Sequence, residues 1–145
     1  MQILRRETDS TTVAAVMQPS GPDDEPLVWD WVEGANCLAA VGAGGVVAWS
    51  PDPRRPARAE GMAFTGVMAA ATQEGLSLVQ GKLLEREGFR LQASEPVSLH
   101  VRFAGGQPQE VRLGYQSEAA LTITWRGGTQ RIGGKPRQTY EITAR

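Results

Sequence analysis

The residue types that could perform catalysis are scarce in this chain of 145 residues. Its single histidine, His100, lies in an alternating segment between Ser98 and Arg102. Nucleophilic catalysis needs a hydroxyl or thiol, a base beside it and a group that orients the base, and no Gly-x-Ser-x-Gly turn presents such a nucleophile. We therefore expect no catalytic residue and no enzymatic activity in this chain. His100 is expected to make a surface or cross-strand hydrogen bond.

The residues that bind metals and phosphates show no matching arrangement either. One cysteine and one histidine cannot form a structural zinc site. Asp23, Asp24, Glu25 and Asp30 are close in the sequence, but their spacing fits no calcium-binding loop. The Gly-Gly pairs lack the lysine and hydroxyl residue of a phosphate-binding loop. We expect no metal and no cofactor, and for Cys37, which lies in an apolar run, a buried and unreactive thiol.

Tryptophans are the first candidates for ligand binding. Trp29 and Trp31 share one face of a predicted strand, and Trp49 follows across a predicted hairpin. The indole ring offers a flat apolar surface on which the C–H face of a sugar can stack, but the same ring can fill the core of a sandwich. Both roles stay open for Trp29 and Trp31. Trp125 continues an apolar alternation and is expected in the core.

Arginines are the second candidates for ligand binding. Arg54, Arg55 and Arg58 share a segment with three prolines over residues 50–58. Guanidinium groups pair with carboxylates through two parallel hydrogen bonds, and uronic-acid polymers carry such carboxylates. We expect these arginines either to bind an acidic glycan or to form a solvated rim.

The charge and hydropathy of the chain argue against several partners. The net charge is −1, so no overall field attracts nucleic acid or an anionic membrane. No apolar stretch approaches the roughly 18 residues of a membrane-spanning helix, and the N-terminal residues do not read as a secretory signal. We expect neither a nucleic-acid nor a membrane partner. The oligomeric state and the compartment stay open.

The elements that position these residues are predicted to be β-strands. Over residues 96–126, apolar and polar side chains alternate, which is typical of antiparallel strands with one buried face. We predict a meander there, with Tyr115 on its apolar side. Turn signals at intervals of about 8–12 residues divide the chain into about a dozen short strands. Residues 62–72 fit strand and helix patterns and are assigned to a strand; residues 81–88 are assigned to a link.

This pattern predicts one all-β domain over residues 1–145, an antiparallel β-sandwich, with a closed β-barrel as the alternative. Strand-like sequence begins almost at Met1. A domain excised from a longer chain would begin in this way, and so could a small intact protein.

The order of strands and loops resembles the C-terminal β-sandwich of heparinase II/III-like and alginate-lyase-like polysaccharide lyases. The similar segments are residues 11–19, 45–51, 74–78 and 93–99, and Gln18 stands where a histidine is expected in that family. In such enzymes the catalytic residues come mainly from other domains, so the resemblance implies a non-catalytic accessory module.

Two kinds of partner follow from that resemblance. The module would bind a polysaccharide itself or pack against an adjacent catalytic domain, and it would then be extracellular or periplasmic. The alternative is a small self-contained protein that oligomerises or binds a small apolar ligand in a barrel mouth.

Overall fold

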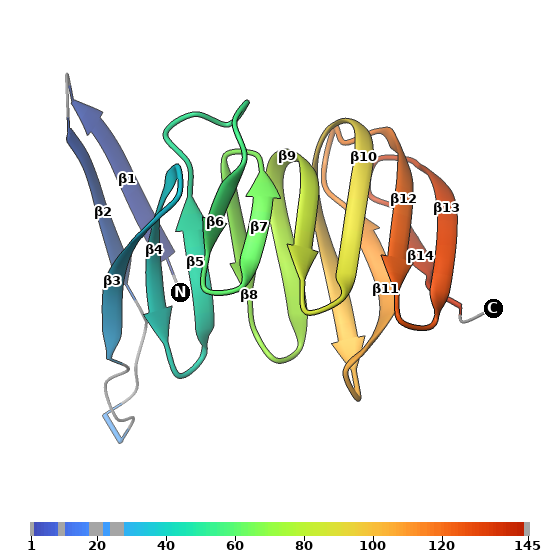
Figure 1. Cartoon of the computed structure of the whole chain (residues 1–145), viewed down its shortest axis with the longest axis horizontal. Helices are drawn as coiled ribbons and strands as arrows, with labels where there is room; N and C mark the ends of the chain where they lie inside the picture. Colours follow the sequence, from blue (N-terminus) through green and yellow to red (C-terminus); the bar gives the residue numbers. More distant parts are fainter. Residues whose placement is uncertain (1, 9–10, 18–21, 24–27, 144–145) are drawn as a thin grey trace.

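The computed structural model describes residues 2–8, 11–17, 22–23 and 28–143. Across these residues the regular elements are strands, with no helix that could cross a membrane. β1 (Gln2–Thr8) and β2 (Thr11–Met17) form a two-stranded sheet of their own. The other described strands belong to one 12-stranded antiparallel sheet, which is open rather than closed into a barrel (Figure 1). The predicted all-β sandwich is confirmed.

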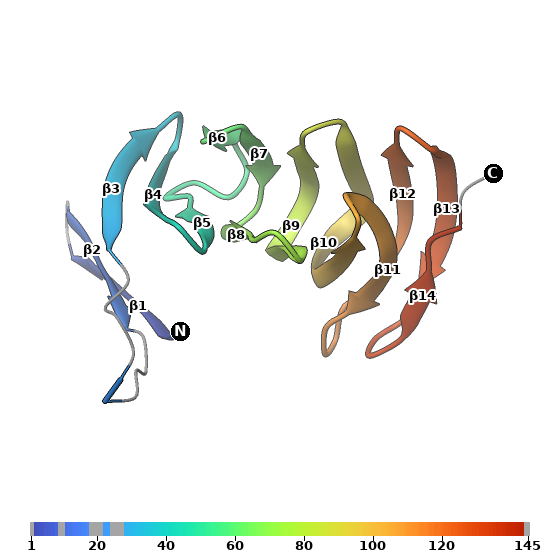
Figure 2. The ribbon, with the colours of Figure 1, turned by 90° about the horizontal axis from the view of Figure 1, so that it is seen from below.

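The large sheet folds back on itself into two facing layers (Figure 2). The first layer contains β3 (Trp29–Gly34), β4 (Cys37–Gly42), β5 (Gly45–Trp49), β8 (Met68–Ala71), β11 (Gln107–Leu113) and β14 (Thr139–Glu141). The second layer contains β6 (Ala57–Ala59), β7 (Met62–Thr65), β12 (Ala119–Trp125) and β13 (Gly128–Gly134). Two long strands, β9 (Gly75–Arg86) and β10 (Phe89–Ala104), run through both layers.

The pairing of β9 and β10 shows how one sheet makes two layers. The first part of β9 pairs with β8, and its last residues pair with β7. The first part of β10 pairs with β12, and its last residues pair with β11. Register shifts between Gln92 and Leu99 lie where β10 passes from one layer to the other. Strands that change sheets commonly do so at such irregularities.

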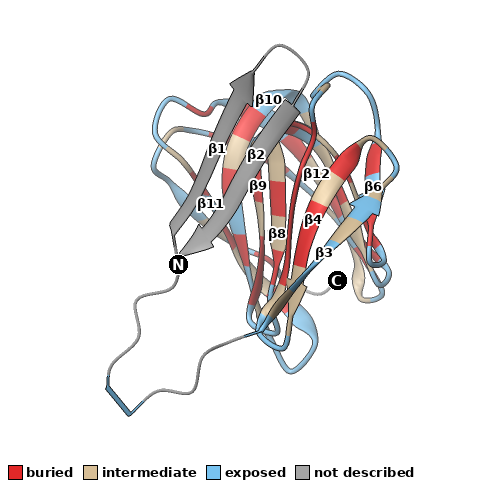
Figure 3. Ribbon diagram, turned by 90° about the vertical axis from the view of Figure 1, so that its left-hand side faces the viewer, coloured by how far each residue is buried: buried red, intermediate tan, exposed pale blue. Residues whose placement is uncertain are grey.

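The core lies between the layers and is built from the inward residue of each alternating pair. In β10, Leu91, Val97 and Val101 are fully buried, whereas Arg90 and His100 are exposed. Figure 3 shows buried positions along β4, β8, β10 and β12. Burying such a side chain contributes roughly 1.5–3 kcal/mol, so this alternation supplies much of the driving force for folding.

Residues 62–72 form strand rather than helix, as predicted, but they divide into two strands, β7 and β8, with a break at Gly66 and Val67. The predicted link over residues 81–88 is wrong: β9 continues to Arg86, and only Glu87 and Gly88, both with positive φ, make the turn. The predicted meander is wrong in its pairing, because β12 pairs with the first part of β10 rather than with β11. The prediction that Tyr115 lies on a buried apolar face is wrong: Tyr115 lies beyond β11 and is 65% exposed, and Arg137 covers one face of its ring at 4.2 Å from the centroid.

Candidate functional site

The outer face of the first layer carries a group of apolar side chains that we call the tryptophan face. Its members come from β3, β4, β5 and β8 and are Trp29, Trp31, Leu38, Ala40, Val47, Trp49, Met68 and Ala70. They alternate with residues of the main core, such as Ala39 and Ala48, so both sides of β4 and β5 are apolar. An apolar outer face distinguishes these strands from the exposed polar positions of β10.

Within the tryptophan face, Trp31 is the ring most open to solvent. It is 48% exposed, whereas Trp49 is 2% exposed and Trp29 is half-buried. The rings of Trp31 and Trp49 meet edge to face, with centroids 5.7 Å apart and planes at 83°. Such a pair adds roughly 0.5–1.5 kcal/mol, which favours a fixed orientation for Trp31. The indole N–H groups of Trp29 and Trp49 are buried and have no hydrogen-bond partner among the described residues, so these rings contribute apolar area.

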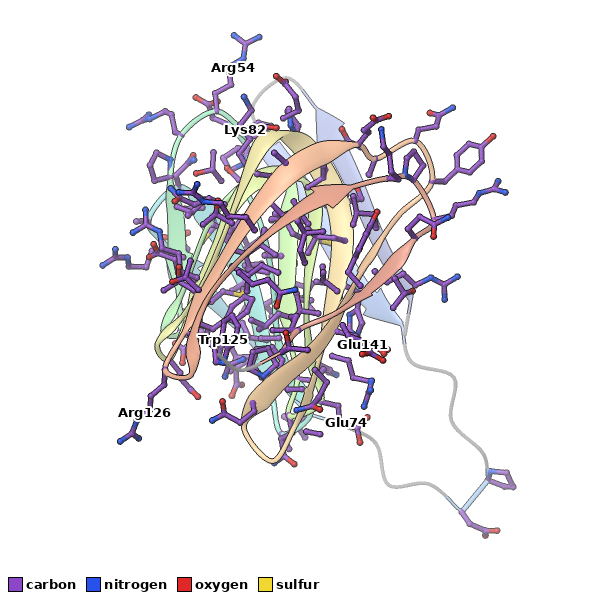
Figure 4. The ribbon with its side chains drawn as sticks, turned by 90° about the vertical axis from the view of Figure 1, so that its right-hand side faces the viewer. Arg54, Glu74, Lys82, Trp125, Arg126 and Glu141 are labelled. Atoms are coloured by element: carbon purple, nitrogen blue, oxygen red, sulfur yellow. The ribbon has the colours of Figure 1, made fainter. Side chains whose placement is uncertain are left out.

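One asparagine holds the loop between β5 and β6, which we call the arginine loop (residues 50–56). Asn36 Nδ2 lies 2.9 Å from Ser50 Oγ, 3.0 Å from the carbonyl oxygen of Asp52 and 3.1 Å from that of Arg55. The Asp52 carboxylate accepts a bond from the backbone N–H of Arg54 at 3.1 Å. These bonds fix a loop that displays Arg54 and Arg55 to solvent, and Figure 4 shows Arg54 extending from this end of the sandwich.

The structure brings the three predicted tryptophans together and separates one predicted arginine from them. Arg58 lies in β6 and alternates with the buried Ala57 and Ala59, so it points outward from the second layer. Arg54 and Arg55 lie on the loop that crosses from one layer to the other. Arg54 and Arg55 are therefore the arginines that follow the tryptophan face directly along the chain.

His100 lies exposed on the outer face of the first layer. Its Nδ1 atom is 2.9 Å from Ser77 Oγ, which confirms the predicted cross-strand hydrogen bond. The nearby Glu110 accepts a bond from Arg102 Nε at 3.1 Å, and this bond lowers the pKa of the Glu110 carboxyl. Both contacts are exposed side-chain pairs on the surface of the sheet.

Cys37 is buried, as predicted, and its Sγ donates to the carbonyl oxygen of Arg58 at 3.4 Å. Burial raises the pKa of this thiol, which disfavours the reactive thiolate. In the part of the chain that the structure describes, no three His, Cys, Asp or Glu side chains gather closely enough to hold a metal ion. Asp24 and Glu25 lie outside the described residues.

Sequence reasoning missed a second site, a cleft of about 700 Å³ that we call the inter-sheet cleft. Its lining includes the β4–β5 turn and the β9–β10 turn, which lie at the opposite end of the sandwich from the arginine loop (Figure 1). Its lining also includes Leu76, Arg86, Phe89, Phe103, Trp125 and Arg126. One sequence signal for this site was available: Arg86 follows Leu84 by two residues, so in a strand both side chains point to the same, inward face. The assignment of residues 81–88 to a link hid this signal.

Comparisons of the chain with protein-family models, with curated proteins and with solved structures give no match.

Proposed function

We propose that this protein is a non-catalytic, carbohydrate-associated β-sandwich module that binds a uronate-containing glycan through the tryptophan face and the arginine loop. One observation carries the proposal: Trp31, a half-exposed ring braced by Trp49, lies on the face that leads into a loop displaying two arginines. In this role Trp31 stacks on a sugar ring, and Arg54 and Arg55 pair with carboxylates.

Preorganisation supports this role for the two groups of residues. A ring fixed by an edge-to-face contact and a loop fixed by Asn36 lose little conformational freedom on binding, and such losses cost roughly 0.5–1.5 kcal/mol per mobile side chain. In the same proposal, the module serves as an accessory to a polysaccharide-degrading enzyme, the role that the resemblance to lyase sandwiches implies.

Affinity electrophoresis tests the proposal with alginate and polygalacturonate as acidic polymers and with a neutral glucan. We expect acidic polymers to retard the protein, and Trp31→Ala to reduce the association constant by about ten-fold or more, as for the loss of one stacked ring. The double variant Arg54→Gln/Arg55→Gln should abolish the preference for acidic polymers. Tyr115→Ala is the matched control, because Tyr115 is an exposed aromatic residue outside the tryptophan face. Absence of retardation by every polymer would refute glycan binding.

A second candidate function is docking of the tryptophan face against an adjacent catalytic domain. It is favoured by the exposure of Val28 (77%), which precedes β3, together with that of Trp31. Trp31→Ala would then weaken association with that domain and leave electrophoresis in every polysaccharide unchanged.

A further inference from the structure

We propose that the inter-sheet cleft binds a small molecule that combines an apolar ring with a carboxylate, and that Arg86 holds the carboxylate. The mouth of this cleft lies at the opposite end of the sandwich from the arginine loop, and the proposal does not depend on glycan binding. The cleft volume of about 700 Å³ is within the range of roughly 300–1,000 Å³ that is usual for small-molecule sites.

The position of Arg86 in the sheet is the first argument. Arg86 lies opposite Met62 on one neighbouring strand and opposite Phe89 on the other. Residues opposite each other in an antiparallel pair project from the same face, and Met62 and Phe89 are buried in the core. Arg86 therefore occupies an inward position where the other residues are apolar. A charged side chain in the apolar phase of a strand departs from the local pattern, and such departures are expected at functional sites.

The charges around Arg86 are the second argument. Its side chain is 26% exposed, and its ion-pair partner within the described residues is Glu87 alone, at 3.6 Å from Nε to Oε1. Glu87 is itself 82% exposed, so this pair is well solvated and weak. Arg126, at the rim, has no ion-pair partner among the residues described, and Figure 4 shows it extending outward beside Trp125. The guanidinium of Arg86 is thus available for a bidentate bond with a ligand carboxylate.

The apolar floor of the cleft is the third argument. Phe89 and Phe103 meet edge to face with centroids 5.2 Å apart, and Trp125 completes an aromatic wall. Phe89 belongs to the second layer and Phe103 to the first, so the floor is built from both. A planar ring would bury apolar area there while its carboxylate meets Arg86.

The rim of the cleft is preorganised by tight turns. Glu60 and Gly61 both have positive φ, and so do Glu87 and Gly88. Two such residues in sequence form the hairpin turn that matches the twist of the flanking strands. These turns fix the ends of β6, β7, β9 and β10 around the mouth, which keeps the cleft open without a moving lid.

NMR titration of the ¹⁵N-labelled full chain with 2-naphthoate tests the proposal. We expect saturable shifts at the amides of Gly88, Phe89 and Trp125, and binding of the neutral analogue 2-naphthalenemethanol that is weaker by about ten-fold or more. Arg86→Gln should weaken naphthoate binding by about ten-fold, and Arg86→Lys by less, because lysine keeps the charge but loses the fork. Arg90→Gln is the matched control: Arg90 is an outward, exposed arginine of β10 that pairs with Glu85.

Three results would overturn the assignment. Equal affinity for naphthoate and its alcohol would show that the cleft does not recognise the carboxylate. Unchanged naphthoate binding in both Arg86 variants would show that Arg86 does not hold the carboxylate. Tighter binding of 2-naphthyl phosphate than of naphthoate would overturn the choice of a carboxylate. If Arg86→Gln fails to fold, Arg86→Lys and the neutral analogue still decide the outcome.

Discussion

At the residue scale, Asn36 has two roles that substitution can separate. Its side chain bonds to the arginine loop, and its backbone has φ +51°, a left-handed conformation that asparagine and glycine tolerate best. We expect Asn36→Gly, which removes only the side-chain bonds, to lower the free energy of unfolding by about 1–3 kcal/mol.

Asn36→Ala removes the bonds but keeps a Cβ in the left-handed region, without the polar side chain that lets asparagine tolerate it, so it should cost about 1–2 kcal/mol more than the glycine variant. Urea unfolding of both variants measures the difference. Equal losses in the two variants would show that the backbone strain is relieved by movement of the turn, and no loss in either would contradict the role of Asn36 in the loop.

At the scale of elements, the bend of β9 depends on a close approach between two segments of the backbone. Gly66, between β7 and β8, and Gly81, in β9, lie against each other: a Cβ added to Gly66 would be 2.7 Å from Gly81 Cα. A Cβ on Gly81 would overlap the carbonyl oxygen of Thr65. Gly81→Ala must therefore push strands apart, and overpacking of this kind costs about 1–3 kcal/mol.

The control for this prediction is Gly133→Ala, because Gly133 is exposed and an added Cβ meets nothing within 4 Å. Its backbone is not in the positive-φ region, so the change should be neutral or slightly stabilising. Thermal unfolding of the two variants compares them directly. A loss in Gly133→Ala as large as that in Gly81→Ala would show that any side chain in these strands destabilises, whatever the space around it.

The path of the elements also shows what the sequence could reveal. In β10, the inward residues Phe89, Leu91, Val97, Leu99 and Val101 keep one odd-numbered phase from end to end. This alternation predicted a buried face, but it did not indicate that β10 passes from one layer to the other. In β9, Gln80 has positive φ and Lys82 is exposed, so the apolar phase breaks at the bend.

The candidate sites show the same limit. The spacing of Trp29 and Trp31 on one predicted strand predicted a shared face, but it could not separate core from surface, because that depends on which sheet covers the strand. The inter-sheet cleft is formed by turns far apart in the sequence, so only the pairing of strands brings Arg86 and Trp125 to one mouth.

At the scale of the whole molecule, the sharing of β9 and β10 should make the two layers unfold as one unit. Leu78 is buried in the part of β9 that belongs to the first layer, and Leu84 in the part that belongs to the second. Each Leu→Ala change should cost about 2–5 kcal/mol through the lost apolar contact and the cavity. Because both long strands continue through the bend, we expect this loss to reach both layers equally.

Native-state hydrogen exchange measures this coupling through the amides of β8, in the first layer, and of β12, in the second. Leu84→Ala, in the second layer, should lower the free energy of exchange in β8 by as much as in β12. Leu78→Ala, in the first layer, should lower it in β12 by as much as in β8. If each change lowered protection in its own layer alone, the layers would be separate cooperative units. In that case one layer moves without the other and widens the inter-sheet cleft. Ligand binding in the cleft then raises the protection of amides in both layers together.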